Sequence, residues 1–190
     1  MPVLILGLVL FFAPHSVAIV AADWREARIR QWGEPLWKGV YSLLAAAGLV
    51  LIIWGYALAR GNPVMVYTPP EWLRLPALVL MLPVFPLLLA AYLPGRFRRA
   101  TRHPMLVAIK LWALAHLLTN GMLADVLLFG SFLVWAVADR ISLKHRTART
   151  VPDVPVGRWG DALALGGGLV LYGAFVTWLH AWLIGMPLVA

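Results

Sequence analysis

The sequence contains no cysteine, and this absence excludes several kinds of site. Without thiolates the chain forms no disulfide and holds no iron–sulfur cluster, cysteine-bound zinc ion or thiolate-bound haem. A transition-metal site in this chain must therefore rely on other ligands, and the five histidines are the natural candidates.

Charged side chains are also scarce. They make up 13% of the 190 residues, whereas 62% of the residues are hydrophobic and the mean hydropathy is +0.83. A soluble domain of this length could not keep so much apolar surface from water, because its own surface needs more charge. The composition therefore predicts an all-α, polytopic membrane protein, with a soluble helical protein of unusually large core as the alternative.

Six apolar segments are long enough, or nearly so, to cross a bilayer, which takes ~20 residues of helix. They are residues 2–21, 40–59, 73–93, 104–119, 122–139 and 162–186. The first has no Lys or Arg before its apolar core, so we expect a retained span rather than a signal peptide. Thr119-Asn120-Gly121 predicts a helical hairpin, with one broken re-entrant helix as the alternative. No polar linker divides the chain, so we expect a single domain over residues 1–190.

Prolines and glycines predict two local features of these spans. Pro76, Pro83 and Pro86 should kink the third span, because proline removes a backbone donor and clashes with the preceding turn. Gly166-Gly167-Gly168 should let the sixth span approach a neighbouring helix closely.

Basic residues predict the orientation of the spans. They gather after the first, third and fifth spans, whereas the alternate loops carry few. The clusters are Arg25, Arg28, Arg30 and Lys38; then Arg96, Arg98, Arg99 and Arg102; then Arg140, Lys144, Arg146, Arg149 and Arg158. By the positive-inside rule these loops are cytoplasmic, so both termini are periplasmic. The net charge of +8 is then a topology signal, and we expect no nucleic-acid partner.

A few ionisable residues lie within the apolar segments, where they are costly and usually face the interior of a bundle. At 1.5 Å per residue, Lys110 and His15 each lie ~10 Å from the cytoplasmic face. The same rise predicts an inner group and an outer group. The inner group is His15, His103 and Lys110, and the outer group is His116, Asp125 and His180.

Buried histidines suit haem, because bis-histidine pairs from two helices often hold it in bundles. Depth leaves two pairs open, His15 with His103 and His116 with His180. Acid–base catalysis, or a plain hydrogen bond between helices, is equally compatible with each histidine. Lys110 suits a haem propionate, a phosphate or a helix carbonyl.

The start of the fourth span predicts an anion site. Pro104 opens this helix, and Arg99 and Arg102 stand beside its positive N-terminal end. A propionate, a lipid headgroup or a cofactor carboxylate would fit there, although a positive-inside cluster explains the same residues. The tryptophans and tyrosines near the span ends, Trp24, Trp32, Trp37 and Trp135 among them, suit interfacial anchoring.

Several stretches of the chain resemble the NnrU family of bacterial membrane proteins. They are Phe11-Phe12-Ala13-Pro14-His15, the run from Tyr41 through Gly48 to Trp54-Gly55-Tyr56, and Arg102-His103-Pro104 followed by Leu111 to Gly121. The resemblance covers about residues 1–185 and implies the bacterial inner (cytoplasmic) membrane.

The resemblance also implies a cofactor and a choice of ligands. The family is similar to the ζ-carotene isomerase of plants, a membrane enzyme with haem b. Its proposed haem ligands correspond to His15 and His103, so the resemblance selects that pair. We then expect Arg99, Arg102 and Lys110 to neutralise the propionates and His116 to line the pocket.

Three functions follow from the resemblance. The first is redox-gated cis–trans isomerisation of a hydrophobic polyene or related lipid, such as a carotenoid, with membrane lipids as further partners. The second is a non-catalytic haem protein that supports nitrite and nitric oxide reduction in denitrification. The third is a membrane methyltransferase, because Arg-His-Pro also opens a helix that helps to hold S-adenosylmethionine in such enzymes. Those enzymes carry a further acidic residue near the end, and none follows Asp161 here.

Overall fold

The computed structural model describes residues 1–145, 157 and 159–188, and it confirms the all-α class. Those residues form two compact units, which are described separately. Unit 1 comprises residues 1–69 and 120–145, and unit 2 comprises residues 70–119, 157 and 159–188. Arg146, Arg149 and Arg158, which we counted in the third basic cluster, lie outside the described residues.

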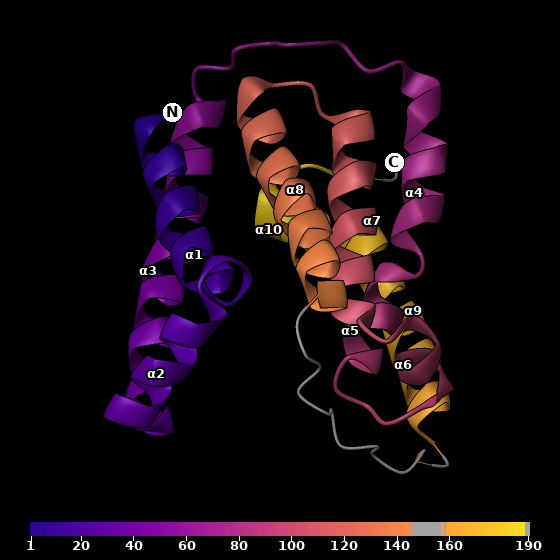
Figure 1. Ribbon diagram of the computed structural model, residues 1–190. Coiled ribbons are helices and arrows are strands. Elements are labelled where there is room, and N and C mark those ends of the chain that lie inside the picture. Colours follow the sequence, from indigo (N-terminus) through magenta and orange to yellow (C-terminus); the bar gives the residue numbers. More distant parts are fainter. Residues whose placement is uncertain (146–156, 158, 189–190) are drawn as a thin grey trace. The chain divides into compact units, whose positions relative to one another are not determined.

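Unit 1 is built on α1 (Pro2–Val20) and α3 (Glu34–Arg60), which lie side by side (Figure 1). Its other helices are α2 (Ala22–Trp32) and α8 (Leu123–His145). Glycines bring α1 and α3 together, because a methyl group at Gly7 would meet the backbone of Ile52 and one at Gly55 would meet that of Leu4. α8 packs against α1 and α3.

Backbone hydrogen bonds to the loop after α3 fix the start of α8. Met65 pairs with Met122 in an antiparallel bridge, and the Val66 N–H donates to the Gly121 carbonyl at 2.8 Å. The Leu123 N–H donates to the Val64 carbonyl, also at 2.8 Å. The loop after α3 therefore shares backbone hydrogen bonds with the residues that lead into α8.

Unit 2 is a set of shorter helices. They are the 3₁₀ turn η1 (Glu71–Leu73), α4 (Arg74–Met81), α5 (Val84–Ala90), α6 (Arg96–Thr101), α7 (Pro104–Thr119), α9 (Gly160–Ala174), the π turn η2 (Phe175–Leu179) and α10 (His180–Ile184). α7 packs against α4 and α5, and α9 packs against α5.

The proline and glycine predictions are each confirmed in part in unit 2, since Pro76 and Pro86 lie within α4 and α5 and do not interrupt these helices. The third span breaks at Pro83 into α4 and α5, as expected of a proline within an apolar helix. Gly168 lies against α5, where an added methyl group would meet the backbone of Pro86. Gly166 instead faces open space, so the close contact depends on Gly168 rather than on all three glycines.

Among the described residues, five helical segments are long and apolar enough to cross a membrane: Pro2–Val20, Glu34–Arg60, Glu71–Ala90, Leu123–His145 and Gly160–Ile184. α7 is a shorter apolar helix of 16 residues, or ~24 Å. α7 ends at Thr119 and α8 begins at Leu123, so the chain breaks at the predicted Thr119-Asn120-Gly121 turn. The choice between a helical hairpin and a broken re-entrant helix stays a prediction. By length and hydropathy the protein is a multi-pass membrane protein.

Candidate functional site

His15 is held in one tautomer by its own helix. Its Nδ1 lies 2.6 Å from the carbonyl oxygen of Phe11, one turn earlier on α1. A carbonyl oxygen only accepts, so Nδ1 must carry the proton and donate it. In the neutral ring the lone pair is then on Nε2, which is the form that binds a metal.

Aromatic rings from three helices surround this half-buried imidazole. The Phe11 ring stacks on it with centroids 4.3 Å apart and planes inclined by 23°. Tyr41 on α3 lies 5.0 Å away, and Trp135 on α8 meets the imidazole edge-on at 5.8 Å and 90°. α1, α3 and α8 therefore each place an aromatic ring against the imidazole.

Trp135 carries a buried polar atom with no partner. Its indole Nε1 is enclosed, and no acceptor within the described part of the chain reaches it. Buried N–H groups are nearly always hydrogen-bonded, so this donor calls for an acceptor that the described residues do not supply. Trp135 also lines a shallow groove between α1 and α8, together with Phe12, Ser16 and Ser131.

His103 lies in unit 2, where it immediately precedes α7. Its carbonyl accepts from the Leu106 N–H at 3.1 Å, and Pro104 is the first residue of the helix, as predicted. Arg102 adopts φ 58°, a left-handed conformation that side chains rarely adopt. The turn between α6 and α7 is thus fixed by an unusual backbone at the Arg102-His103 step.

The predicted cationic residues of unit 2 lie on these two helices. Arg99 on α6 and Arg102 at its end are exposed. Lys110 is half-buried on α7, about two turns beyond His103, and its ammonium has no hydrogen-bond or ion-pair partner within the described residues. The binding of a haem propionate, a phosphate or a helix carbonyl by Lys110 stays a prediction.

The other two histidines of unit 2 are also bonded to backbone. The His116 Nδ1 donates to the Trp112 carbonyl at 2.7 Å, and the His180 Nδ1 donates to the Met186 carbonyl at 2.7 Å. His180 thereby ties α10 to the residues after Gly185, which has φ 75°. α7 packs against α4, α5 and α6, whereas α10 packs against η2. The pairing of His116 with His180 stays a prediction.

Asp125, which we placed with these histidines in an outer group, belongs to unit 1 and has a structural role there. Its side chain is 0% exposed. Tyr56 Oη donates to Oδ1 at 2.6 Å, and the Met122 N–H donates to Oδ2 at 2.9 Å. The carboxylate therefore caps the first turn of α8 and links it to α3.

Sequence reasoning missed the neighbours of His15 on other helices. Phe11 could be found from its i−4 spacing, but we assigned Trp135 to interfacial anchoring and gave Tyr41 no role. One residue of the sequence could have indicated that α3 lies close to Phe11, and that residue is Gly48. A methyl group at Gly48 would meet the Phe11 backbone, so this glycine lies at the contact of α1 with α3.

No three His, Asp or Glu side chains of the described residues gather as metal ligands. A bare zinc ion normally needs three or four protein ligands, whereas haem needs only one or two, because the porphyrin supplies the other four.

Comparisons with known proteins identify the family. No curated protein and no solved structure matches the chain. The sequence model of the family described as NnrU protein matches residues 3–188, which is nearly the whole chain. This multi-pass membrane protein, with its aromatic His15 site in unit 1 and its Arg-His-Pro turn in unit 2, belongs to the NnrU family.

Proposed function

We propose that the protein binds haem b and that His15 is an axial ligand of the iron. The observation that carries the proposal is the bond from His15 Nδ1 to the Phe11 carbonyl at 2.6 Å, which leaves the Nε2 lone pair for a metal. Such a bond from the other ring nitrogen is typical of metal-binding histidines, because it fixes the tautomer and the orientation of the ring.

The surroundings of His15 support a large planar ligand. Phe11, Tyr41 and Trp135 all contact the imidazole, and aromatic side chains of this kind also pack against an aromatic macrocycle. The unpaired Trp135 Nε1 would donate to an acceptor that the ligand or a bound water supplies. Haem, when bound, supplies an iron centre for Lewis-acid or one-electron chemistry.

The remaining site residues of the proposal come from the resemblance and belong to unit 2. His103 is the second ligand, Arg99, Arg102 and Lys110 neutralise the propionates, and His116 lines the pocket. Their chemistry is compatible with these roles: His103 is an imidazole before a helix, Arg99 and Arg102 are cations close to it in sequence, and the Lys110 ammonium has no partner among the described residues. The membrane is the bacterial inner membrane, with the basic clusters on its cytoplasmic side.

The proposed activity is redox-gated cis–trans isomerisation of a hydrophobic polyene or related lipid. The second candidate is a non-catalytic haem protein linked to nitrite and nitric oxide reduction, which the same histidine site would serve. A S-adenosylmethionine-dependent methyltransferase gains no support. No acidic residue follows Asp161, and Asp161 itself accepts from the Arg96 and Phe97 N–H groups at 2.9 and 3.0 Å and so caps α6.

The test is an absorbance spectrum of the detergent-purified protein, oxidised and then reduced, after expression with haem supply. A Soret band that shifts on reduction is expected. His15→Ala and His103→Ala should each shift or abolish it, whereas His145→Ala, an exposed residue at the end of α8, should leave it unchanged. A colourless wild-type protein contradicts the proposal, and loss of the band only in His116→Ala contradicts the ligand assignment. Tight S-adenosylmethionine binding by calorimetry would favour the methyltransferase instead.

A further inference from the structure

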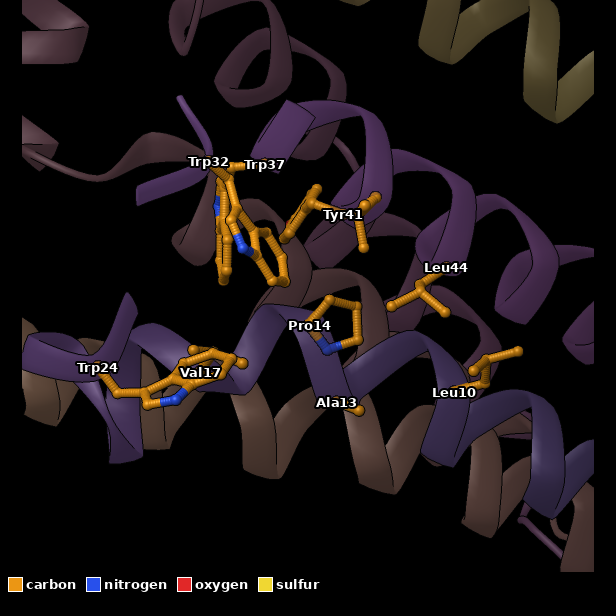
Figure 2. A pocket seen from close by; sticks show the side chains of 10 residues that line it. Leu10, Ala13, Pro14, Val17, Trp24, Trp32, Trp37, Tyr41 and Leu44 are labelled. Carbon is orange, nitrogen blue, oxygen red and sulfur yellow. The ribbon is translucent and has the colours of Figure 1, made fainter. Parts of the chain in front are cut away.

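Three tryptophans stand at the mouth of an apolar groove in unit 1, which we call the Trp groove (Figure 2). The groove has a volume of about 240 Å³ and lies between α1, α2 and α3. Trp24, Trp32 and Trp37 gather at one end, and Pro14, Leu10 and Leu44 continue it along α1 and α3.

The Trp groove runs from an interface into hydrocarbon. Trp37 to Leu44 is seven residues of helix, so the groove extends ~10 Å along α3 from its aromatic mouth. Tryptophan prefers the headgroup level of a bilayer, and the deeper lining is aliphatic. Trp24 and Trp32 remain 47% and 41% exposed, so the mouth is open to a ligand.

Two arginines of α2 are stacked on these rings. The Arg28 guanidinium lies 5.4 Å from the Trp24 centroid and 5.9 Å from that of Trp32, and Arg25 lies 6.0 Å from that of Trp37. Such cation–π contacts hold the guanidinium groups in place. They leave the charge available, because Arg28 otherwise donates only to the neutral Gln31 Oε1.

The neighbouring cations behave differently. Arg30 pairs with Glu26 at 3.9 Å and Lys38 with Glu34 at 3.0 Å, and both are exposed. Arg25 and Arg28 are half-buried, and no carboxylate of the described residues pairs with either. The two arginines at the groove therefore carry positive charge that nothing in the described chain neutralises.

We propose that the Trp groove binds one anionic phospholipid, with an acyl chain along α1 and α3 and the phosphate beside Arg25 and Arg28. The charge complementarity is direct, because the groove is apolar below and cationic at its rim. Anionic headgroups are attracted by basic residues next to a membrane span, and stacked guanidinium groups suit phosphate. The proposal does not depend on haem binding.

Native mass spectrometry of the detergent-solubilised full chain tests the proposal, with dioleoyl phosphatidylglycerol and dioleoyl phosphatidylcholine as probes. The wild type should retain one phosphatidylglycerol in preference to phosphatidylcholine. Each lost arginine should weaken that binding about fivefold, the factor that ~1 kcal/mol per basic residue gives, so Arg25→Ala with Arg28→Ala should weaken it ~30-fold. Arg30→Ala is the matched control, since it removes a cation of the same helix that is already paired.

Two further variants separate the parts of the proposed site. Trp32→Ala should also release the lipid, whereas Trp182→Ala, an exposed tryptophan of unit 2, should not. Equal retention of the two lipids by the wild type overturns the proposal, as does an equal loss in Arg30→Ala and the double variant. A dimer that Trp32→Ala dissociates also overturns it, because a second copy would then occupy the groove.

Discussion

Replacing Tyr56 by phenylalanine removes one hydroxyl group and leaves the shape of the side chain unchanged. Asp125 is 0% exposed and receives two hydrogen bonds, one from Tyr56 Oη at 2.6 Å and one from the Met122 N–H at 2.9 Å. Tyr56→Phe leaves a buried carboxylate oxygen without its donor, which costs about 1–3 kcal/mol. For a chain of this size that cost lowers the melting midpoint by roughly 2–12 °C.

Thermal unfolding in detergent, followed by circular dichroism, measures this shift against two graded controls. Tyr92→Phe should leave the midpoint unchanged, because that side chain is 74% exposed. Tyr172→Phe should lie between the two, because its hydroxyl donates to the neutral Leu78 carbonyl at 2.9 Å, a bond worth about 0.5–1.5 kcal/mol. If Tyr56→Phe melts with Tyr92→Phe, Asp125 does not link α8 to α3 as described.

Three further substitutions test the packing and the turns. Gly55→Ala should lower the melting midpoint, because its methyl group meets the Leu4 backbone. Gly130→Ala faces open space, so it should raise the free energy of unfolding by at most ~1 kcal/mol and should not lower the midpoint. The reverse order would refute the contact of α1 with α3. Asp161→Asn should speed amide hydrogen exchange in α6 by weakening a cap worth about 0.5–2 kcal/mol, and unchanged exchange would contradict that cap. Arg102→Gly should melt above Arg102→Ala, since only glycine relieves the ~1–2 kcal/mol cost of φ 58°; an equal midpoint would show that the turn is unstrained.

Composition and apolar run length were enough to predict the all-α membrane fold. Apolar run length predicted the long spans and proline predicted the break at Pro83, because these features depend on local sequence. The helix ends were less predictable: α3 begins at Glu34 and α8 continues to His145, several residues beyond the apolar runs. Amphiphilic residues such as Lys38 and Lys144 extend a helix out of the hydrocarbon, so hydropathy alone underestimates its length.

The candidate site was predictable only where it is local. Phe11 and His15 share a turn of α1, so their contact follows from spacing, and Pro104 opening α7 follows from proline chemistry. The contacts of His15 with Tyr41 and Trp135 depend on how α1, α3 and α8 pack, and tryptophan composition instead favoured an interfacial role. Likewise, the burial of Asp125 depends on Tyr56, which lies 69 residues away in the chain.

The central proposal is that His15 is a ligand of haem iron. The decisive measurement is the absorbance spectrum of His15→Gly, purified with and without added imidazole, beside wild type and His145→Gly. We predict that His15→Gly loses or shifts the Soret band and that imidazole restores it, because the free base replaces the missing ring. His145→Gly should match the wild type. A wild-type Soret band that His15→Gly leaves unchanged would contradict the central claim.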